Sequence, residues 1–238
     1  MCTVTFYKGE GKVIITSNRD EHVKRPLAIP PQKIITKNGW LYAPIDPVSN
    51  GTWFGVTNQG NVIVLLNGAS HKHEQNPPYR KSRGSILWEL LNRASDLEED
   101  WSSISLVDIE PFTLVAYIDT CLMQLRWDGK MKSRTLLDEG QHHIWSSATL
   151  YDPKVTAVRK SWFDHFIQQR TEAIEENDIL YFHTNTRRGD AENGLVINRA
   201  QTMLTKNITQ CICTKKAMTI RHFNLINGKH ASLNDELS

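Results

Sequence analysis

The sequence has few cysteines, little net charge and no long hydrophobic run, and each absence excludes a class of protein. Four cysteines in 238 residues are too few for a disulfide-rich scaffold. A net charge of +2 gives no reason to expect nucleic acid or an anionic membrane as a partner. No segment approaches the roughly 20 apolar residues of a membrane-spanning helix, so we expect no integral membrane segment.

The N-terminus also lacks the pattern of a signal peptide, because Lys8, Lys12 and Arg19 interrupt it before an apolar run forms. We therefore expect a soluble, cytoplasmic protein with reduced cysteines. A chain of this length can bury a core without disulfides or metals. It contains neither a repeat nor a linker that would divide it, so we expect a single domain over residues 1–238.

The pattern of apolar residues and turn signals predicts hairpins at both ends of the chain and helices between them. A first hairpin is expected over residues 2–16, with a polar cluster at 18–22 and an exposed loop at 25–31. The expected strands that follow are 53–57, 62–66, a hairpin over 112–127, 179–182, 194–204, 210–214 and 218–223; the expected helices are 82–94 and 153–169. Short connections favour antiparallel pairing, so the fold class is α+β.

Cys2 is the first residue that could carry chemistry. Removal of Met1 would leave one residue with both a thiol and a free α-amine, whose reference pKa values are about 8.5 and about 8. The amine could then act as the base for its own thiol, which would attack an acyl carbon. The alternative is that Cys2 is an ordinary strand residue, and for Cys2 considered alone this alternative is the commoner case.

Two further groups of polar residues could assist such a thiol. A hairpin returns the Asn18-Arg19-Asp20-Glu21 cluster to the N-terminus, where an arginine would favour thiolate and a carboxylate would hold the α-amine. A solvated turn is the alternative for this cluster. Asn58 and Asn67 both occur near glycines after short strands, where an amide could donate to an oxyanion or could simply form a turn.

These residues resemble those of a known family. The start Met-Cys-Thr, the run Thr16–Glu21 and the segment Gly51-Thr52-Trp53-Phe54-Gly55 are similar to the NRDE family, also called the transport and Golgi organisation 2 family. Residues 68–69 and 77–84 resemble its connection from loop to helix. The likeness is close over the first ~90 residues and looser over the last ~90. That family in turn resembles the choloylglycine hydrolases and penicillin V acylases.

The resemblance implies a four-layer αββα sandwich with two stacked antiparallel sheets, as in N-terminal nucleophile hydrolases. It implies Cys2 as nucleophile, with Arg19, Asp20, Asn67 and Arg199 as further catalytic residues. The remaining candidates, assigned to substrate binding, are Asn18, Asn58 and Ser147. Ser147 falls where the related hydrolases carry an asparagine, so the resemblance is weakest there.

Two functions remain open from the sequence. The first is hydrolysis of a non-peptide amide or a thioester by Cys2. The second is non-catalytic binding or trafficking of haem, acyl-CoA or another lipid on the same fold, because family members are associated with lipid balance and haem movement. Either function implies a small-molecule substrate or a hydrophobic ligand, with no resident cofactor.

Weaker signals complete the sequence-based predictions. We expect no metal site, because His71-Lys72-His73-Glu74 lacks the spacing of a zinc motif. Cys211 and Cys213 should share one face of a strand as buried apolar residues rather than as a redox pair. His142 and His143 should point to opposite faces of a strand, and Arg187-Arg188 should lie in a solvated turn.

Overall fold

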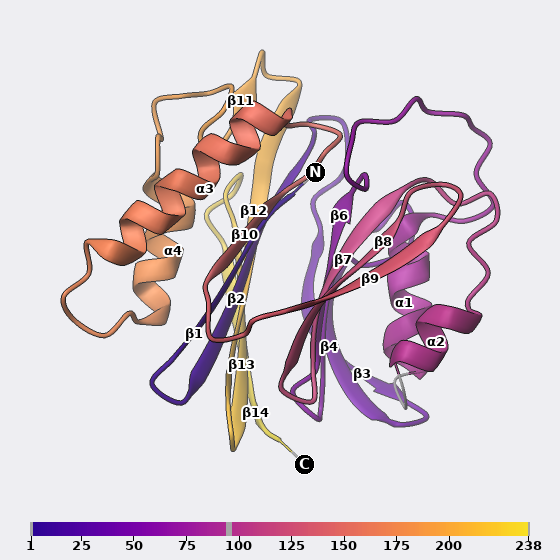
Figure 1. The fold of residues 1–238 in the computed structure, drawn as a ribbon, viewed down its shortest axis with the longest axis horizontal. Coiled ribbons are helices and arrows are strands. Elements are labelled where there is room, and N and C mark those ends of the chain that lie inside the picture. The colour runs from indigo at the N-terminus through magenta and orange to yellow at the C-terminus, as the bar shows by residue number, and fades with distance from the viewer. Residues whose placement is uncertain (1, 94–96, 238) are drawn as a thin grey trace.

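Two antiparallel sheets stack face to face in the computed structural model, which describes residues 2–93 and 97–237. Helices cover both outer faces, so the chain has the four-layer αββα arrangement (Figure 1). The predicted fold class is thereby confirmed. The α3 (Pro153–Gln168) and α4 (Glu176–Asn185) helices lie on one outer face, and α1 (Arg83–Arg93) and α2 (Leu97–Ser103) lie on the other.

The first sheet combines both ends of the chain. Its order is β10-β1-β2-β12-β13-β14, with the short β11 paired to β12. The strands are β1 (Cys2–Gly9), β2 (Lys12–His22), β10 (His143–Ser146), β11 (Asn198–Arg199), β12 (Met203–Thr214), β13 (Ala217–Asn224) and β14 (His230–Glu236).

The second sheet follows the chain order from β3 to β9, so each strand is paired to the next along the chain. Its strands are β3 (Ile29–Thr36), β4 (Gly39–Ile45), β5 (Phe54–Thr57), β6 (Val62–Asn67), β7 (Phe112–Ile118), β8 (Cys121–Trp127) and β9 (Lys132–Leu137). Most of these neighbours are joined by short connections, because antiparallel strands need only a few linking residues. The exception is the connection from β6 to β7, which spans residues 68–111 and includes α1 and α2.

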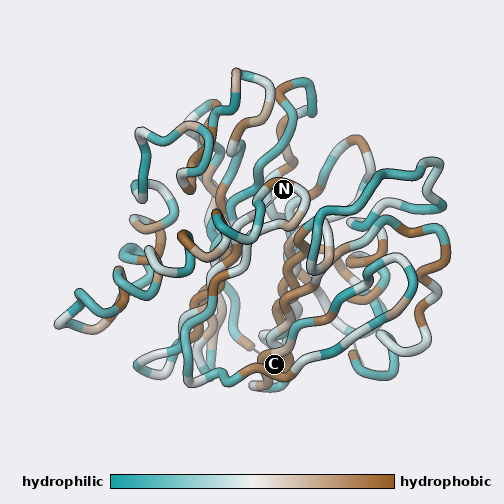
Figure 2. The backbone as a smooth tube through the Cα atoms, turned by 45° about the horizontal axis from the view of Figure 1, so that its top comes forward, coloured by the Kyte–Doolittle hydropathy of each residue, from teal (hydrophilic) through white to brown (hydrophobic). Residues whose placement is uncertain are grey.

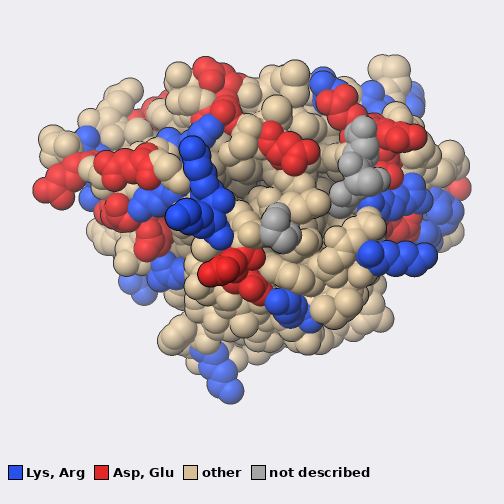
Figure 3. Space-filling view, turned by 90° about the horizontal axis from the view of Figure 1, so that it is seen from below, with Lys and Arg blue, Asp and Glu red and all other residues tan. Residues whose placement is uncertain are grey.

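The main hydrophobic core fills the space between the sheets and continues beneath α1. Phe6 from the first sheet and Phe54 from the second are both fully buried in it, and Leu90 joins it from α1. A smaller cluster under α3 and α4 contains Phe163 and Phe182. Hydrophobic segments run along the inner strands, while the outer loops are mainly hydrophilic (Figure 2). The surface view mixes Lys and Arg with Asp and Glu, as the small net charge suggests (Figure 3).

Most predicted elements match the structure. The hairpin over 112–127 is β7 and β8, and the helix predicted at 153–169 is α3, which begins after Asp152. The Asp152 carboxylate accepts a hydrogen bond from the backbone N–H of Val155 and caps the helix, with Pro153 in the first turn. The helix predicted at 82–94 is α1; its last predicted residue, Ala94, lies outside the described residues.

Two strand predictions in the C-terminal third were wrong. Residues 179–182 belong to α4, where Ile179, Phe182 and His183 are buried at helical spacing. A short apolar run does not distinguish a strand from a buried helix. Most of residues 194–204 are not in a strand, because Ala200 and Gln201 have φ angles of 46° and 57° and form a tight turn.

The interpretation of residues 25–31 as an exposed loop was also partly wrong, because β3 begins at Ile29. This strand contains Pro30 and Pro31 and forms the outer edge of the second sheet, where missing N–H groups are tolerated. The polar residues 18–22 do not follow β2 but belong to it, and Asn18 and Asp20 are fully buried. The alternative of a solvated turn is therefore excluded for this cluster.

Candidate active site

A tight hairpin sets the position of the N-terminal strand. Glu10 and Gly11 connect β1 to β2 with φ angles of 50° and 76°, as in the two-residue turns that suit the twist of a hairpin. This turn fixes the register, so Cys2 lies directly opposite Arg19 and Thr3 opposite Asn18. Met1 lies outside the described residues, and Cys2 is described as a backbone position only.

Arg19 is buried and held on one side of its guanidinium. Its Nη2 lies 2.5 Å from Asp46 Oδ2 and 3.2 Å from Glu21 Oε2, and its guanidinium stacks 4.5 Å from the Trp53 ring centre. The other nitrogen, Nη1, is buried and has no hydrogen-bond partner among the residues that the structure describes. A buried donor of this kind is poised to meet an acceptor on a ligand or a neighbouring group.

Asp46 anchors this part of the site. Its carboxylate also accepts hydrogen bonds from Arg25 and from the backbone N–H groups of Val48 and Ser49. Burial raises the pKa of Asp46, but Arg25, the Ser49 N–H and Arg19 together outweigh it and hold the pKa below its ordinary value. Asp46 is therefore a carboxylate at neutral pH and can orient Arg19.

A cavity of about 660 Å³ opens beside Arg19. Asn67 lines it at the end of β6, and Trp53 lines it with a buried indole N–H that has no partner among the described residues. The backbone carbonyl of Asn67 accepts a hydrogen bond from the Ser147 hydroxyl at 2.7 Å. The structure therefore gathers Asn67 and Arg19, the residue opposite Cys2, around one space.

Ser147 is fully buried and is not among the residues that line this cavity. Its Oγ also lies 2.9 Å from the Thr149 hydroxyl, so it joins the end of β6 to the loop after β10. Thr149 and Leu150 from that loop do line the cavity. Ser147, the position at which the family resemblance is weakest, thus supports the wall of the site.

Asp20 lies next to Arg19 in β2 and accepts two hydroxyl hydrogen bonds, from Tyr151 at 2.7 Å and from Thr205 at 2.6 Å. Burial and the Asp20 carboxylate raise the pKa of the Tyr151 phenol well above its ordinary value, so the phenol stays a donor. The pairing of β12 with β2 shifts register between Thr205 and Asn207, opposite Asp20 and Arg19. Such bulges are common beside functional sites.

Asn18 belongs to a different network, beneath α4. Its Nδ2 donates to the carbonyls of His183 and Leu195, so its Oδ1 accepts from His183 Nδ1 at 2.6 Å. His183 Nε2 is then the acceptor for the Thr5 hydroxyl, 2.7 Å away. Burial, followed by the Arg159 charge, lowers the pKa of His183 to about 3. Asn18 is a structural neighbour of the site and is not among the cavity-lining residues.

Two other predicted site residues lie away from the cavity. Asn58 follows β5 in the turn that leads into β6, whereas Asn67 is at the opposite end of β6. Arg199 donates to the carbonyls of Glu192 and Leu150 and stacks 5.0 Å from the Tyr151 ring. It contacts the cavity wall through Leu150 without lining the cavity itself.

Asp46 was not predicted from the sequence, and no role was expected for the side chain of Trp53. Neither residue lies in a motif that suggests chemistry, and both reach Arg19 from the connection between β4 and β5. Trp53 belongs to the segment 51–55 that carries the family resemblance, and this was the only available signal. A contact between two sheets cannot be read from spacing along one chain.

The remaining candidates form local contacts. His73 lies 3.1 Å from Glu110, and the described residues contain no group of three or more His, Cys, Asp or Glu side chains suited to hold a metal. Cys211 and Cys213 are both buried, with their sulfurs 3.4 Å apart. Within the described part of the chain, no helix has the length and apolar character needed to cross a membrane.

Comparison with solved structures shows the same fold in known hydrolases. The C2A mutant of conjugated bile acid hydrolase from Clostridium perfringens aligns with a TM-score of 0.60 at 12% identity, covering 98% of this chain and 92% of the other. An N-acylethanolamine-hydrolyzing acid amidase orthologue from Caenorhabditis elegans aligns with a TM-score of 0.60 at 10% identity, covering 88% and 92%. No curated protein sequence matches the chain significantly.

The family assignment comes from the sequence itself. The pattern of the Transport and Golgi organisation 2 family matches residues 1–221, nearly the whole chain. This agrees with the resemblance carried by the Met-Cys start and by residues 16–21 and 51–55. The chain therefore belongs to the Transport and Golgi organisation 2 family.

Proposed function

We propose that the protein hydrolyses a non-peptide amide or a thioester, with Cys2 as an N-terminal nucleophile. One observation carries this proposal: Arg19, directly opposite Cys2 in the hairpin, lines a cavity that Asn67 also lines, and its buried Nη1 has no partner among the described residues. Register partners in an antiparallel pair share one face of the sheet. The fold shared with a bile acid hydrolase and an acid amidase supports the same reaction class.

The chemistry proceeds in two steps in this proposal. The α-amine of Cys2 takes the thiol proton, the sulfur bonds to the acyl carbon, and the amine or thiol of the substrate leaves with that proton. Water then adds to the thioester and gives its proton to the α-amine. The carbon–sulfur bond breaks, the carboxylic acid leaves, and the thiol is restored.

Each neighbouring residue has a role in this scheme. The Arg19 charge stabilises the Cys2 thiolate and lowers its pKa. The Asn67 amide donates to the oxyanion, an interaction that contributes several kcal/mol in acyl transfer. Asp20 holds the α-ammonium group, because each of its oxygens keeps acceptor capacity beyond the hydroxyl that it already binds.

Ser147 favours a second candidate function on the same fold. Its hydroxyl contacts Asn67 and Thr149 and is not at the cavity surface, so it does not stand in for a second amide facing a substrate. A protein that binds or traffics haem, acyl-CoA or another lipid would need the cavity without that amide. Saturable binding of haem or of a long-chain acyl-CoA, without turnover, would support this function.

The two functions separate in one experiment. A panel of small amides and thioesters is incubated with the wild type, with Cys2→Ala and with Cys121→Ala, which removes an exposed thiol. The proposal expects turnover by the wild type and Cys121→Ala, and a loss of at least about 100-fold in Cys2→Ala. Equal turnover by Cys2→Ala would contradict it.

We also propose that residues 1–238 form a single domain and that the protein is cytoplasmic.

A further inference from the structure

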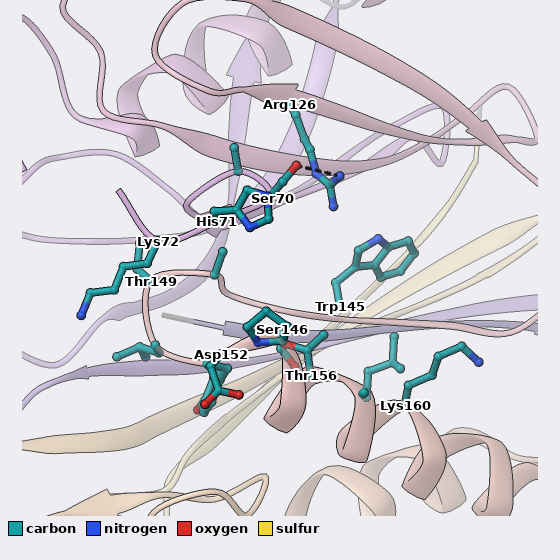
Figure 4. Close-up of a pocket in the computed structure, with 17 residues that line it drawn as sticks. Ser70, His71, Lys72, Arg126, Trp145, Ser146, Thr149, Asp152, Thr156 and Lys160 are labelled. Atoms are coloured by element: carbon teal, nitrogen blue, oxygen red, sulfur yellow. Dashed lines mark hydrogen bonds between the residues drawn. The ribbon is translucent and has the colours of Figure 1, made fainter. Parts of the chain in front are cut away.

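A second cavity, of about 620 Å³, lies on the other side of the loop that walls the candidate active site. Thr149 and Leu150 line both cavities. The walls of the second one come from β8, from β10 and from the beginning of α3, together with residues 69–72 (Figure 4). It therefore opens where the two sheets meet α3, next to the start of β1.

Arg126 is the central charged group of this cavity. It projects from β8, and its Nη1 donates to the Ser70 hydroxyl at 3.3 Å (Figure 4). Its Nε is buried and has no hydrogen-bond partner among the described residues, and no described carboxylate forms a salt bridge with it. Burial alone lowers the pKa of Arg126, which is the signature of a cation without a nearby counter-ion.

Other buried arginines have their charge or their donors satisfied. The fully buried Arg159 lacks a carboxylate among the described residues, but its guanidinium donates to the Thr3 hydroxyl and to the carbonyls of Asn193 and Gly194. Arg19 has Asp46, and Arg83 has Glu110. An arginine remains protonated even when burial disfavours its charge, because its reference pKa is above about 12. A partly desolvated guanidinium with spare donors therefore gains most from an anionic oxygen ligand.

The other charges around the cavity add to this preference. Lys72 and His71 line it from the loop, and Lys160 lines it from α3, although Asp164 already pairs with the Lys160 ammonium. Asp152 is the one acid among the lining residues, and its Oδ1 is engaged in capping α3. The charged residues that line the cavity are therefore mainly cationic, and the N-terminus of α3 is already capped by Asp152.

The remaining surface of the cavity is suited to an apolar group. Trp145 presents its ring from β10, held by a hydrogen bond from its Nε1 to Gln124 and stacked on His143. Ile144, Ala148 and Leu150 also line the cavity. Ser146 lines it too, and its hydroxyl is buried without a partner among the described residues. A ligand with an acidic head and an apolar body would match both surfaces.

We infer that this cavity binds a small organic anion, whose acidic group contacts Arg126 and whose apolar part lies against Trp145. The shared chemistry is an anionic oxygen group, either a phosphate or a carboxylate. The inference concerns binding and stands whether or not Cys2 is a nucleophile. If both proposals hold, the ligand is the anionic part of a substrate or product that reaches past the Thr149–Leu150 wall.

Calorimetric titration of the intact protein tests the inference with three probes: phenyl phosphate, benzoate and the neutral benzyl alcohol. We expect saturable binding of at least one anion and binding of benzyl alcohol that is at least tenfold weaker. Arg126→Gln should weaken the anion at least tenfold, while Arg188→Gln, at an exposed position, should not change it. The tighter of the two anions identifies the preferred acid.

Two results would overturn the inference: no saturable binding of either anion, or unchanged affinity in Arg126→Gln. If that variant does not fold, the Nε–H resonances of wild-type arginines provide the same test. Phenyl phosphate should shift one resonance strongly, and that resonance should be the one missing from the spectrum of Arg126→Lys. If phenyl phosphate does not shift the Nε–H resonance of Arg126, this result would also count against the site.

Discussion

Asp46 Oδ2 lies 2.5 Å from Arg19 Nη2, and this contact joins the connection between β4 and β5 to β2, the strand paired with Cys2. Asp46 holds one side of the guanidinium, while Nη1 on the same group stays buried and without a partner among the described residues. The arrangement orients a positive charge rather than neutralising it completely. It is the feature from which the predictions about Cys2 follow.

Replacement of Arg19 should make the Cys2 thiol less reactive. Arg19→Gln removes the charge that favours thiolate, and a rise of about one unit in the pKa of Cys2 would slow alkylation about tenfold at neutral pH. Arg19→Lys keeps a charge and should retain part of the rate. The measurement is the alkylation rate at Cys2, followed by peptide mass. Equal rates in Arg19→Gln and the wild type would exclude this role.

Asp46→Asn should destabilise the protein strongly. The substitution leaves the buried Arg19 without its closest anion, and breaking one partner of a buried pair costs about 3–5 kcal/mol. Urea unfolding measures the change. Asp164→Asn, which disrupts the more exposed pair with Lys160, is the control and should cost no more than about 1 kcal/mol. Similar losses of unfolding free energy in both variants would contradict the claim that Asp46 forms a buried, stabilising pair with Arg19.

The free energy of unfolding should decrease as the pH falls below 6.5. Burial, then the Arg19 charge, lowers the pKa of His222 to about 4, and His183 has a pKa lowered to about 3. Between these values and 6.5 the unfolded chain binds more protons than the folded one, so acid favours unfolding. Each histidine contributes up to about 1.4 kcal/mol per pH unit in its window.

The variant His222→Asn isolates one of these contributions. The free energy of unfolding is measured with urea between about pH 4.5 and about pH 6.5, because His222 is protonated in the unfolded chain but not in the folded one over this range. It should change less with pH in His222→Asn than in the wild type. His230→Asn changes an exposed histidine and serves as the control. An identical slope in His222→Asn and the wild type would show that His222 is protonated equally in both states.

Ser147→Ala should affect both stability and the site. The Ser147 hydroxyl donates to the carbonyl of Asn67, and a buried carbonyl that loses its partner costs about 1–3 kcal/mol. Because that bond holds the end of β6, turnover of any substrate should also fall. Ser161→Ala, at an exposed hydroxyl on α3, is the control. Unchanged stability and turnover in Ser147→Ala would show that the Ser147 hydroxyl supports neither the fold nor the site.

The sequence predicts the fold well where pattern and resemblance agree. The apolar runs of β7 and β8 and the apolar stripe of α3 identified these elements, and the family resemblance supplied the four-layer arrangement. The strands β3, β4, β9 and β14 were missed. Two of them, β9 and β14, are largely exposed edge strands, and without a buried face they carry little hydrophobic periodicity.

The candidate site could be predicted only in part. The hairpin places Arg19 near Cys2, as expected from a short turn. Asn18 could not be separated from Arg19 by sequence alone, yet the alternation of a strand sends Asn18 beneath α4. Asp46 reaches its cavity from the connection after β4 and Arg126 reaches its cavity from β8, and such contacts depend on how the sheets stack.

The most direct test of the proposed nucleophile combines intact mass with brief iodoacetamide treatment at neutral pH. The account predicts that Met1 is absent from the purified protein and that Cys2 is alkylated at least about tenfold faster than the exposed Cys121. Retention of Met1, or alkylation of Cys2 no faster than that of Cys121, would contradict the central claim.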